Sequence, residues 1–263
     1  MSRALRIHII TSEDPFYLPV FFREFFAHLP RAHVAVTGVD ITPPLNQARH
    51  ASLARKLYGF YGPLDFTRLA LRYAVARAKD ALWPSSWPGT VRRIAAAHGV
   101  PSSVVPKVNA PQYVERLRTF DLDLLVSVAA SQIFTAPLLS VPRLEAINVH
   151  TGPLPQYRGM MPVFWQMRDG RSSIGLTIHT MTPRIDLGEI VVDRRVPLNG
   201  HRTLDAVTRA MKRHGACALL ELLAQYVDGT VKRVRMDEAE GAYRSFPRAS
   251  DAAVLRQRGY RLL

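Results

Sequence analysis

The feature that most constrains the fold of this chain is a repeated alternation of strand-like and helix-like segments. Residues 5–11, 123–129 and 146–150 are apolar runs of strand length, and each is followed by a turn or loop and then by a helical segment. Strands that alternate with helices indicate a parallel sheet with helices on both faces. The sequence therefore predicts an α/β protein with a Rossmann-like, mostly parallel twisted sheet. Apolar residues make up 48% of the chain, which is enough for a sizeable core.

The remaining elements continue this alternation on both sides of one unusual segment. Asp14 is predicted to cap the first helix, with Pro15 at its first position. The tail, residues 227–263, contains two short strand-like pieces and a final helix. The predicted helices span residues 16–29, 67–82, 91–98, 110–119, 134–140, 163–168 and 203–226, and the further strands span 33–39, 103–106, 175–181 and 189–196.

Residues 42–93 interrupt the alternation and carry an unusual charge. The segment has nine basic and two acidic residues, a net charge of +7, which is half of the +14 of the whole chain. One interpretation is an anionic partner such as a phosphate, RNA or an acidic membrane face, since aromatic residues that could stack on bases interleave with Arg and Lys. The other is a helical insertion that covers a site and whose basic face is simply solvated. The aromatic residues are Tyr58, Phe60, Tyr61 and Phe66.

Several classes of protein are disfavoured by features that the sequence lacks. The single cysteine, Cys217, cannot form a disulfide within one chain. No stretch approaches the roughly 18 apolar residues of a transmembrane helix, and the first residues are typical of a strand rather than a signal peptide. We therefore expect a cytoplasmic protein. No Cys/His cluster has metal-ligand spacing, so no metal is expected. The absence of a GxGxxG motif argues against a nicotinamide dehydrogenase.

Three polar residues stand out at the end of strand 146–150 and in a later loop. Asn148 and His150 are two apart on an apolar strand, so both point to the same face near its carboxyl end, where parallel α/β sheets bind ligands. Asp186 lies on a loop between two strands that could return to the same place. An amide that donates to a forming oxyanion, an imidazole that moves a proton and a carboxylate that orients the imidazole suit acyl transfer to an external nucleophile.

Each of these residues also has an ordinary interpretation. A lone histidine at a strand end is usually a satisfied core or surface residue, and Asp186 by itself could be a turn residue. Chemistry and spacing alone leave both interpretations open.

The stretch that contains these residues resembles the signature of the 10-formyltetrahydrofolate-dependent formyltransferases. That family includes glycinamide ribonucleotide, methionyl-tRNA and nucleotide-sugar N-formyltransferases. Its pattern of Asn-x-His, Leu-Pro-x-x-Arg-Gly, Gly-x-Thr and Asp-x-Gly-(Asp/Glu) occurs here in the same order. The resemblance is strong over residues 121–197 and weak before residue 90 and after residue 200. The matching positions are Asn148 and His150, Leu154–Gly159, Gly175–Thr177 and Asp186–Glu189.

The resemblance implies an N-formyltransferase that uses 10-formyltetrahydrofolate as formyl donor and co-substrate. It makes Asn148, His150 and Asp186 the catalytic residues. Residues 1–200 would form the catalytic domain, with the basic insertion at about 42–93, and residues 201–263 a long helix and a small C-terminal extension. The implied cofactor contacts are Ser131, Gln132, Ile133 and Phe134 on one side and Gly152, Pro153, Leu154 and Pro155 on the other.

Some positions depart from the family pattern. Gly152 and Pro153 stand where the family usually has Ser and Leu, which removes a hydroxyl group from the cofactor side. Arg184 and Leu187 stand where Gly and Thr are common around the aspartate. Arg184 could meet the glutamate tail of the folate, a substrate phosphate or only solvent. These changes bear on cofactor affinity more than on the chemistry.

The acceptor is expected to be a primary amine, most simply that of a nucleotide-linked amino sugar or a similar phosphate-bearing small molecule. The turn at residues 11–17 lacks the Gly-rich phosphate loop of glycinamide ribonucleotide formyltransferases. The residues after the core are too few for the C-terminal barrel that methionyl-tRNA formyltransferases normally carry. A tRNA-linked or lipid-linked amine is an alternative. A different class of function would be an RNA-binding or membrane-surface module on a degenerate formyltransferase fold. Weak contact with an anionic membrane and a homodimer stay open.

Overall fold

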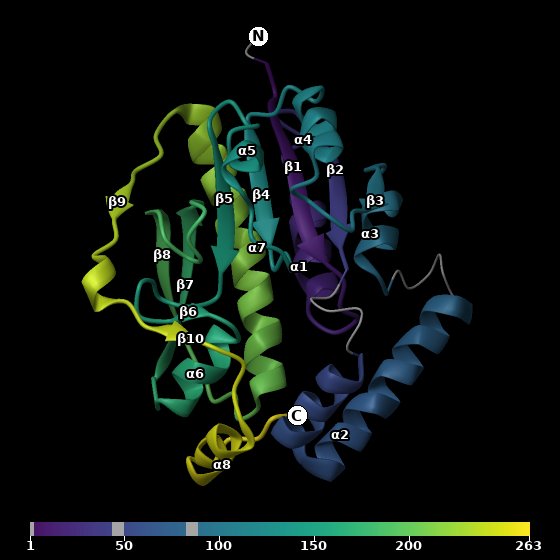
Figure 1. The fold of residues 1–263 in the computed structure, drawn as a ribbon, viewed down its shortest axis with the longest axis vertical. Coiled ribbons are helices and arrows are strands. Elements are labelled where there is room, and N and C mark those ends of the chain that lie inside the picture. The colour runs from purple at the N-terminus through teal and green to yellow at the C-terminus, as the bar shows by residue number, and fades with distance from the viewer. Residues whose placement is uncertain (1–2, 44–49, 83–88) are drawn as a thin grey trace.

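The computed structural model describes residues 3–43, 50–82 and 89–263, and it places their strands in one large sheet and one small one (Figure 1). In the large sheet the first five strands are parallel, and the last three run antiparallel to their neighbours. The order across the sheet is β3 (Ser102–Val104), β2 (Val34–Thr42), β1 (Leu5–Ser12), β4 (Leu124–Val128), β5 (Glu145–His150), β7 (Ser173–Thr180), β8 (Glu189–Pro197) and β9 (Val234–Arg235).

Helices cover both faces of this sheet, because its central strands are apolar on both sides. Ile9 of β1 belongs to one buried cluster and the next residue, Ile10, to another. The first cluster is covered by α1 (Leu18–Ala27), α3 (Val91–Ala97) and α7 (Leu204–Asp228), the second by α4 (Pro111–Arg118) and α5 (Ala136–Leu139). The predicted α/β fold, with a mostly parallel sheet between helices, is confirmed.

The turn after β1 is held by the residue predicted to cap the first helix. The Asp14 carboxylate accepts hydrogen bonds from the backbone N–H groups of Phe16, Tyr17 and Leu18. Helix α1 begins at Leu18, later than predicted, with Pro19 rather than Pro15 in its first turn. Asp14 therefore fixes the backbone of the turn that follows β1, at the carboxyl end of the sheet.

The basic insertion contains a longer helix than the sequence indicated. Helix α2 spans His50–Leu82, whereas only residues 67–82 were predicted to be helical. It is broken at Gly62, which has a φ of 77°, just before Pro63, so two helical parts meet at a bend. Phe60, next to the bend, is buried against Phe164 and Phe246. Phe60 therefore anchors the first part of the helix in the core.

The C-terminal part returns to the loops that follow β5. The short strand β6 (Arg158–Gly159) pairs with β10 (Tyr243–Arg244), a pairing that two-residue strands do not signal in the sequence. The remaining helices are α6 (Pro162–Arg168), the 3₁₀ turn at Glu238–Glu240 and α8 (Ala249–Gln257).

Helix α7 runs along the sheet beside α1 (Figure 1). A side chain at Gly215 would meet Val149 of β5 at 3.3 Å, so the glycine lets α7 approach the strand closely. No helix in the described part of the chain is long and apolar enough to cross a membrane.

Candidate active site

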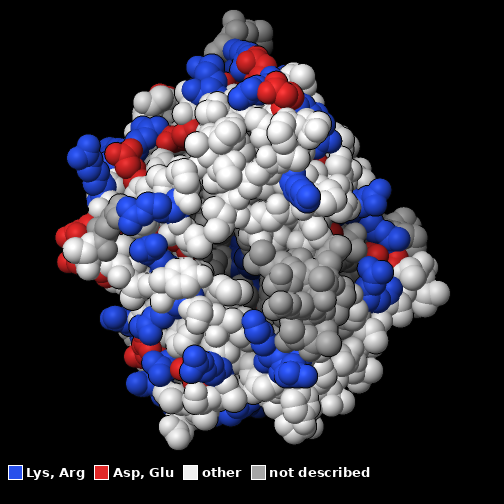
Figure 2. Space-filling view, viewed as in Figure 1, with Lys and Arg blue, Asp and Glu red and all other residues white. Residues whose placement is uncertain are grey.

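A cavity of about 990 Å³ opens at the carboxyl end of the parallel strands. Figure 2 shows a hollow near the centre of one face, with Lys or Arg atoms visible in its depth. The main lining residues of the cavity fall into four groups. One comes from the loop after β4, one from the end of β5 with the 181–186 loop, one from the β1–α1 turn together with α2 and α7, and one from residues 159–164 at the start of α6. The polar residues singled out in the sequence all lie on its wall, namely Asn148, His150 and Asp186.

Asn148 and His150 lie on the same face of β5, as the strand spacing predicted. Because β7 is antiparallel to β5, Asn148 lies directly opposite His179, and His150 lies opposite Thr177. The Asn148 amide nitrogen is 3.2 Å from Nε2 of His179. The sheet pairing therefore brings a second histidine to the two residues on β5.

His179 determines how the Asn148 amide is oriented. Its Nδ1 is 2.8 Å from the Thr180 carbonyl, which can only accept, so Nδ1 carries the proton. Burial, with the neighbouring His150 ring as a second cause, lowers the pKa of His179 to about 4, so the ring is neutral near pH 7. Nε2 is then a lone-pair acceptor, and Asn148 must present its NH₂ group to it. One N–H of the Asn148 amide donates to Nε2 of His179, and the other is free to donate to a ligand in the cavity.

The lowered pKa of His179 also predicts how this residue changes the free energy of unfolding at acidic pH. The unfolded residue gains a proton below its ordinary pKa of 6.5, whereas the folded residue stays neutral down to about 4. Stability is therefore lost as the pH falls from 6.5 to 4, by up to about 3 kcal/mol. We expect His179→Gln, which keeps a hydrogen-bond acceptor but does not titrate, to lose correspondingly less free energy of unfolding between pH 7 and pH 4.

Denaturant titrations at the two pH values measure this difference. The matched control is His33→Gln, at an exposed histidine, which should behave like the wild type. If the wild type and His179→Gln lost stability equally, the neutral state of the buried ring would be contradicted.

His150 is held in the opposite tautomer from His179. Its Nε2 donates to the Tyr157 carbonyl at 2.7 Å, so in the neutral ring Nδ1 is unprotonated. Nδ1 lies 3.8 Å from Oδ1 of Asp186, beyond direct hydrogen-bond distance but close enough for strong attraction if the ring is charged. Only 6% of the surface of His150 is exposed, and the residue lines the cavity. A proton gained by this ring would therefore sit at Nδ1 and face the carboxylate.

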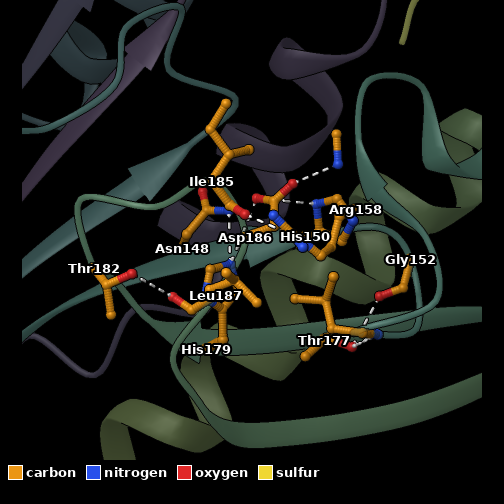
Figure 3. Close-up of polar contacts among 12 residues, drawn as sticks. Asn148, His150, Gly152, Arg158, Thr177, His179, Thr182, Ile185, Asp186 and Leu187 are labelled. Carbon is orange, nitrogen blue, oxygen red and sulfur yellow. Dashed lines mark hydrogen bonds and ion pairs between the residues drawn. The ribbon is translucent and has the colours of Figure 1, made fainter. Parts of the chain in front are cut away.

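Asp186 lies between the two histidines (Figure 3). Its Oδ1 is 3.8 Å from both His150 Nδ1 and His179 Nε2, and its Oδ2 accepts from the backbone N–H of Gly159 at 2.6 Å. The residue itself has a left-handed φ of 49°. The sequence prediction that a distant loop returns its carboxylate to the end of β5 agrees with this geometry.

The loop that carries Asp186 is fixed from both ends. The Thr182 hydroxyl donates to the Leu187 carbonyl at 3.1 Å, and the Arg158 guanidinium donates to the Ile185 carbonyl at 3.1 Å (Figure 3). Leu187 is buried, so the departure from the family pattern at this position serves packing. The carboxylate is therefore held by the surrounding chain and does not depend on a ligand for its position.

The first set of expected folate contacts lies on the cavity wall. Ser131, Gln132, Ile133 and Phe134 all line it. Their side-chain hydrogen bonds are made with neighbouring segments, as when Gln132 accepts from the N–H of Val108 and donates to the Pro106 carbonyl. Within the described chain the backbone N–H groups of residues 132–134 make no hydrogen bond. These free donors on a large, mostly apolar wall fit a flat heterocycle with acceptor atoms.

The second set of expected folate contacts is placed differently. Gly152, Pro153, Leu154 and Pro155 are not among the residues that line the main cavity. Thr177 holds the loop against β7, because its hydroxyl donates to the Gly152 carbonyl at 2.8 Å and accepts from the Leu154 N–H at 3.3 Å. In the structure this loop packs against the His150 ring, since a side chain at Gly152 would lie 3.0 Å from its Nε2. The contact of the loop with folate stays a prediction.

Of the third group of lining residues, only the turn at residues 11–17 was linked to the acceptor in the sequence. The group contains Asp14, Tyr17, Tyr61, Thr208 and Lys212, from the β1–α1 turn, α2 and α7. Two further residues had only weak signals in the sequence. His179 is a polar residue in a mostly apolar strand, and Lys212 is the only lysine of the helix 204–228. Arg184 also lines the cavity, on the side of the 181–186 loop. In the described residues no cluster of His, Cys, Asp and Glu could hold a metal ion.

Comparison with known proteins identifies the family. The model of the formyl transferase family matches residues 92–223, which is half of the chain and contains all three residues around the cavity end of β5. The chain belongs to the formyl transferase family. Enzymes of this family transfer a formyl group and take it from 10-formyltetrahydrofolate.

Among curated relatives, this formyltransferase is similar to methionyl-tRNA formyltransferases. The enzyme of Geobacter metallireducens is 32% identical over 207 residues, which is 74% of this chain and 67% of the relative. The enzyme of Lachnospira eligens is 33% identical over 153 residues, 58% of this chain. The chain spans only about half of the length of that second relative, 49%, and of several others.

Solved structures share the fold of this formyltransferase at low sequence identity. A sugar N-formyltransferase from a Shewanella species superposes with a TM-score of 0.57 and 20% identity, over 92% of this chain and 76% of the other. Glycinamide ribonucleotide transformylase 1 from Symbiobacterium toebii gives a TM-score of 0.60 and 14% identity, over 89% of this chain and 96% of the other. At these identities the likeness shows the fold alone.

Proposed function

We propose that this formyltransferase moves a formyl group from 10-formyltetrahydrofolate to a primary amine, with Asn148, His150 and Asp186 as its catalytic residues. The observation that carries this proposal is their convergence on one wall of a single large cavity, inside the region that matches the family. When bound, the folate supplies an activated formyl group. Residues 131–134 would line its ring, and residues 132–134 would offer it their free backbone N–H groups.

Asn148 is proposed to stabilise negative charge on the formyl oxygen. The amide is already oriented by His179, so one N–H can point into the cavity without reorganisation during the reaction. A preorganised donor of this kind contributes about 10²–10³ in rate. His179 is therefore a positioning residue for Asn148.

His150 is proposed to take the proton of the attacking amine at Nδ1. The proton would then be passed, directly or through water, to N10 of the folate as the bond between N10 and the formyl carbon breaks and tetrahydrofolate leaves. The other nitrogen of His150 is committed to the Tyr157 carbonyl, so Nδ1 is the basic atom of the neutral ring. The protonated ring would face Asp186 at 3.8 Å in a largely buried setting, where the attraction between opposite charges is several times stronger than in water. Asp186 would thereby favour the charged imidazolium and keep it in place. Holding both reactants in one cavity would supply a large part of the rate gain.

The acceptor is proposed to be a small phosphate-bearing amine, such as a nucleotide-linked amino sugar. Tyr61 of α2 and Leu204, Thr208 and Lys212 of α7 line the same cavity as the residues proposed to bind folate, so a small acceptor and the donor could share it. Of the four aromatic residues that could stack on RNA, Phe60 and Tyr61 are buried and therefore unavailable to bases. Both observations favour a small molecule.

A second candidate acceptor is a tRNA-linked amine. It is supported by the methionyl-tRNA formyltransferase relatives, which are named for that substrate, and by the exposed Arg55, Lys56, Arg68 and Arg77 on α2. These cations would also suit an anionic membrane that presents a lipid-linked amine. In either case binding would weaken steeply with salt.

The acceptor class can be tested by offering the three kinds of amine side by side. The chain is incubated with 10-formyltetrahydrofolate and either UDP- and dTDP-linked amino sugars, methionyl-tRNA, or anionic vesicles that contain an aminosugar lipid. We expect a mass gain of one CO unit on a nucleotide-linked amino sugar. Formylation of methionyl-tRNA or of the lipid alone would contradict the small-molecule acceptor and replace it with the one modified. His150→Ala serves as the inactive control.

A further inference from the structure

Lys212 lies on the acceptor side of the cavity, close to the end of β5. One turn further along α7, Gly215 packs against Val149, the residue between Asn148 and His150. Because α7 and β5 run in opposite directions where they pack (Figure 1), the turn that carries Lys212 lies beyond the carboxyl end of the strand. Lys212 and His150 line the same cavity. The ammonium group is thus placed where an acceptor would enter.

Lys212 has no hydrogen-bond or ion-pair partner in the described part of the chain. Burial lowers its pKa, and the only carboxylate that acts in the other direction is Asp14. The oxygens of Asp14 are already used by the backbone N–H groups of residues 16–18. Lys212 is half-buried on the cavity wall, and a partly desolvated cation without an ion-pair partner is costly to a fold. Such a residue is better explained by a ligand than by packing.

Neighbouring basic groups on the same side are already paired, which sets Lys212 apart. Arg72 of α2 and Arg209 of α7 both contact the Asp205 carboxylate, at 2.9 and 3.0 Å, and the Tyr17 hydroxyl donates to it as well. Both guanidinium groups thus have a carboxylate partner, and of this cluster only Tyr17 lines the cavity. Thr208, one turn before Lys212, adds a hydroxyl group to the same wall.

We propose that Lys212, with Thr208, binds an oxyanion of the acceptor, either a phosphate or a carboxylate carried near the reacting amine. The ammonium group would supply the charge and the Thr208 hydroxyl a hydrogen bond to the same group. This proposal rests on the proposed function, since it names the chemical group that the acceptor site selects. It also places the anion inside the cavity and not on the basic outer surface of α2.

The test measures binding, so that it does not depend on turnover. Inorganic pyrophosphate and glucuronate are titrated calorimetrically against the wild type, Lys212→Met and Thr208→Val, with Lys232→Met as the control at an exposed lysine. We expect Lys212→Met to weaken the bound anion by at least about tenfold and Thr208→Val by a few-fold. Binding of pyrophosphate alone would identify a phosphate, and binding of glucuronate alone a carboxylate.

A separate titration with 5-formyltetrahydrofolate distinguishes this proposal from the proposed function. We expect folate binding to be unchanged in Lys212→Met and the melting temperature not to fall, because a half-buried cation without an ion-pair partner is replaced by an apolar side chain. The proposal is overturned if neither anion binds the wild type at millimolar concentration. It is also overturned if Lys212→Met binds them as the wild type does, or if the variant melts at a lower temperature and loses folate as well. Failure of the wild type to bind folate would instead contradict the proposed function.

Discussion

Replacing Asp186 with asparagine is expected to lower the turnover number for formyl transfer by about a thousandfold. The substitution keeps the size of the side chain and an oxygen that can accept from the Gly159 N–H, but it removes the charge. His150 would then gain a proton at Nδ1 with no carboxylate 3.8 Å away to stabilise it. His150→Ala removes the proton acceptor itself and should cost at least as much. Initial rates at saturating donor and acceptor measure both effects.

The controls for this prediction separate chemistry from folding. Asp193→Asn, at a half-exposed carboxylate of β8 that is paired with Arg195, should leave the rate unchanged. Because His150 and Asp186 act as one unit, the double variant should be no slower than the slower single variant. Activity of Asp186→Asn within a few-fold of the wild type, in a normally folded protein, would remove Asp186 from the catalytic set.

Replacing Gly188 with alanine is expected to destabilise the protein by about 3 kcal/mol or more, or to displace the Asp186 loop. The backbone φ of Gly188 is 149°, and an added Cβ would lie 2.0 Å from the Thr180 carbonyl oxygen, which is backbone and cannot move aside. A loop that shifts to relieve this overlap would carry Asp186 away from both histidine rings. Both the free energy of unfolding and the rate of formyl transfer should therefore fall.

Gly200→Ala provides a matched comparison. Gly200 also has a positive φ, 75°, but an added Cβ would meet nothing within 4 Å. It should cost only about 1 kcal/mol, the ordinary price of a left-handed residue, and leave the rate intact. Equal effects of the two substitutions would mean that the contact with Thr180 does not hold the Asp186 loop.

The sequence predicted the part of the site that depends on strand alternation. Asn148 and His150 could be assigned to one face because side chains two apart on a strand always share a face. The carboxyl end of the strand could be named as the binding edge because the sheet was predicted to be parallel. The position of Asp186 followed from the family resemblance, since a loop of that length can return to many places.

The parts that sequence reasoning missed depend on contacts between distant segments. His179 faces Asn148 only because β7 pairs with β5 in one particular antiparallel register. The first part of helix α2 is anchored by the packing of Phe60 on Phe164, a residue that is distant in the sequence. Lys212 enters the cavity because Gly215 lets α7 approach β5. None of these contacts has a local pattern.

The most direct test of the central claim is an assay of the wild-type chain with 10-formyltetrahydrofolate and the panel of amines. Release of tetrahydrofolate and the mass of each amine are followed together, with Asp186→Asn in parallel. If the chain transfers a formyl group with the help of Asp186, one class of amine gains the mass of a CO unit at the rate at which tetrahydrofolate appears. Asp186→Asn then loses both signals. Release of tetrahydrofolate with free formate and no modified amine, or equal rates for the wild type and Asp186→Asn, would contradict this proposal.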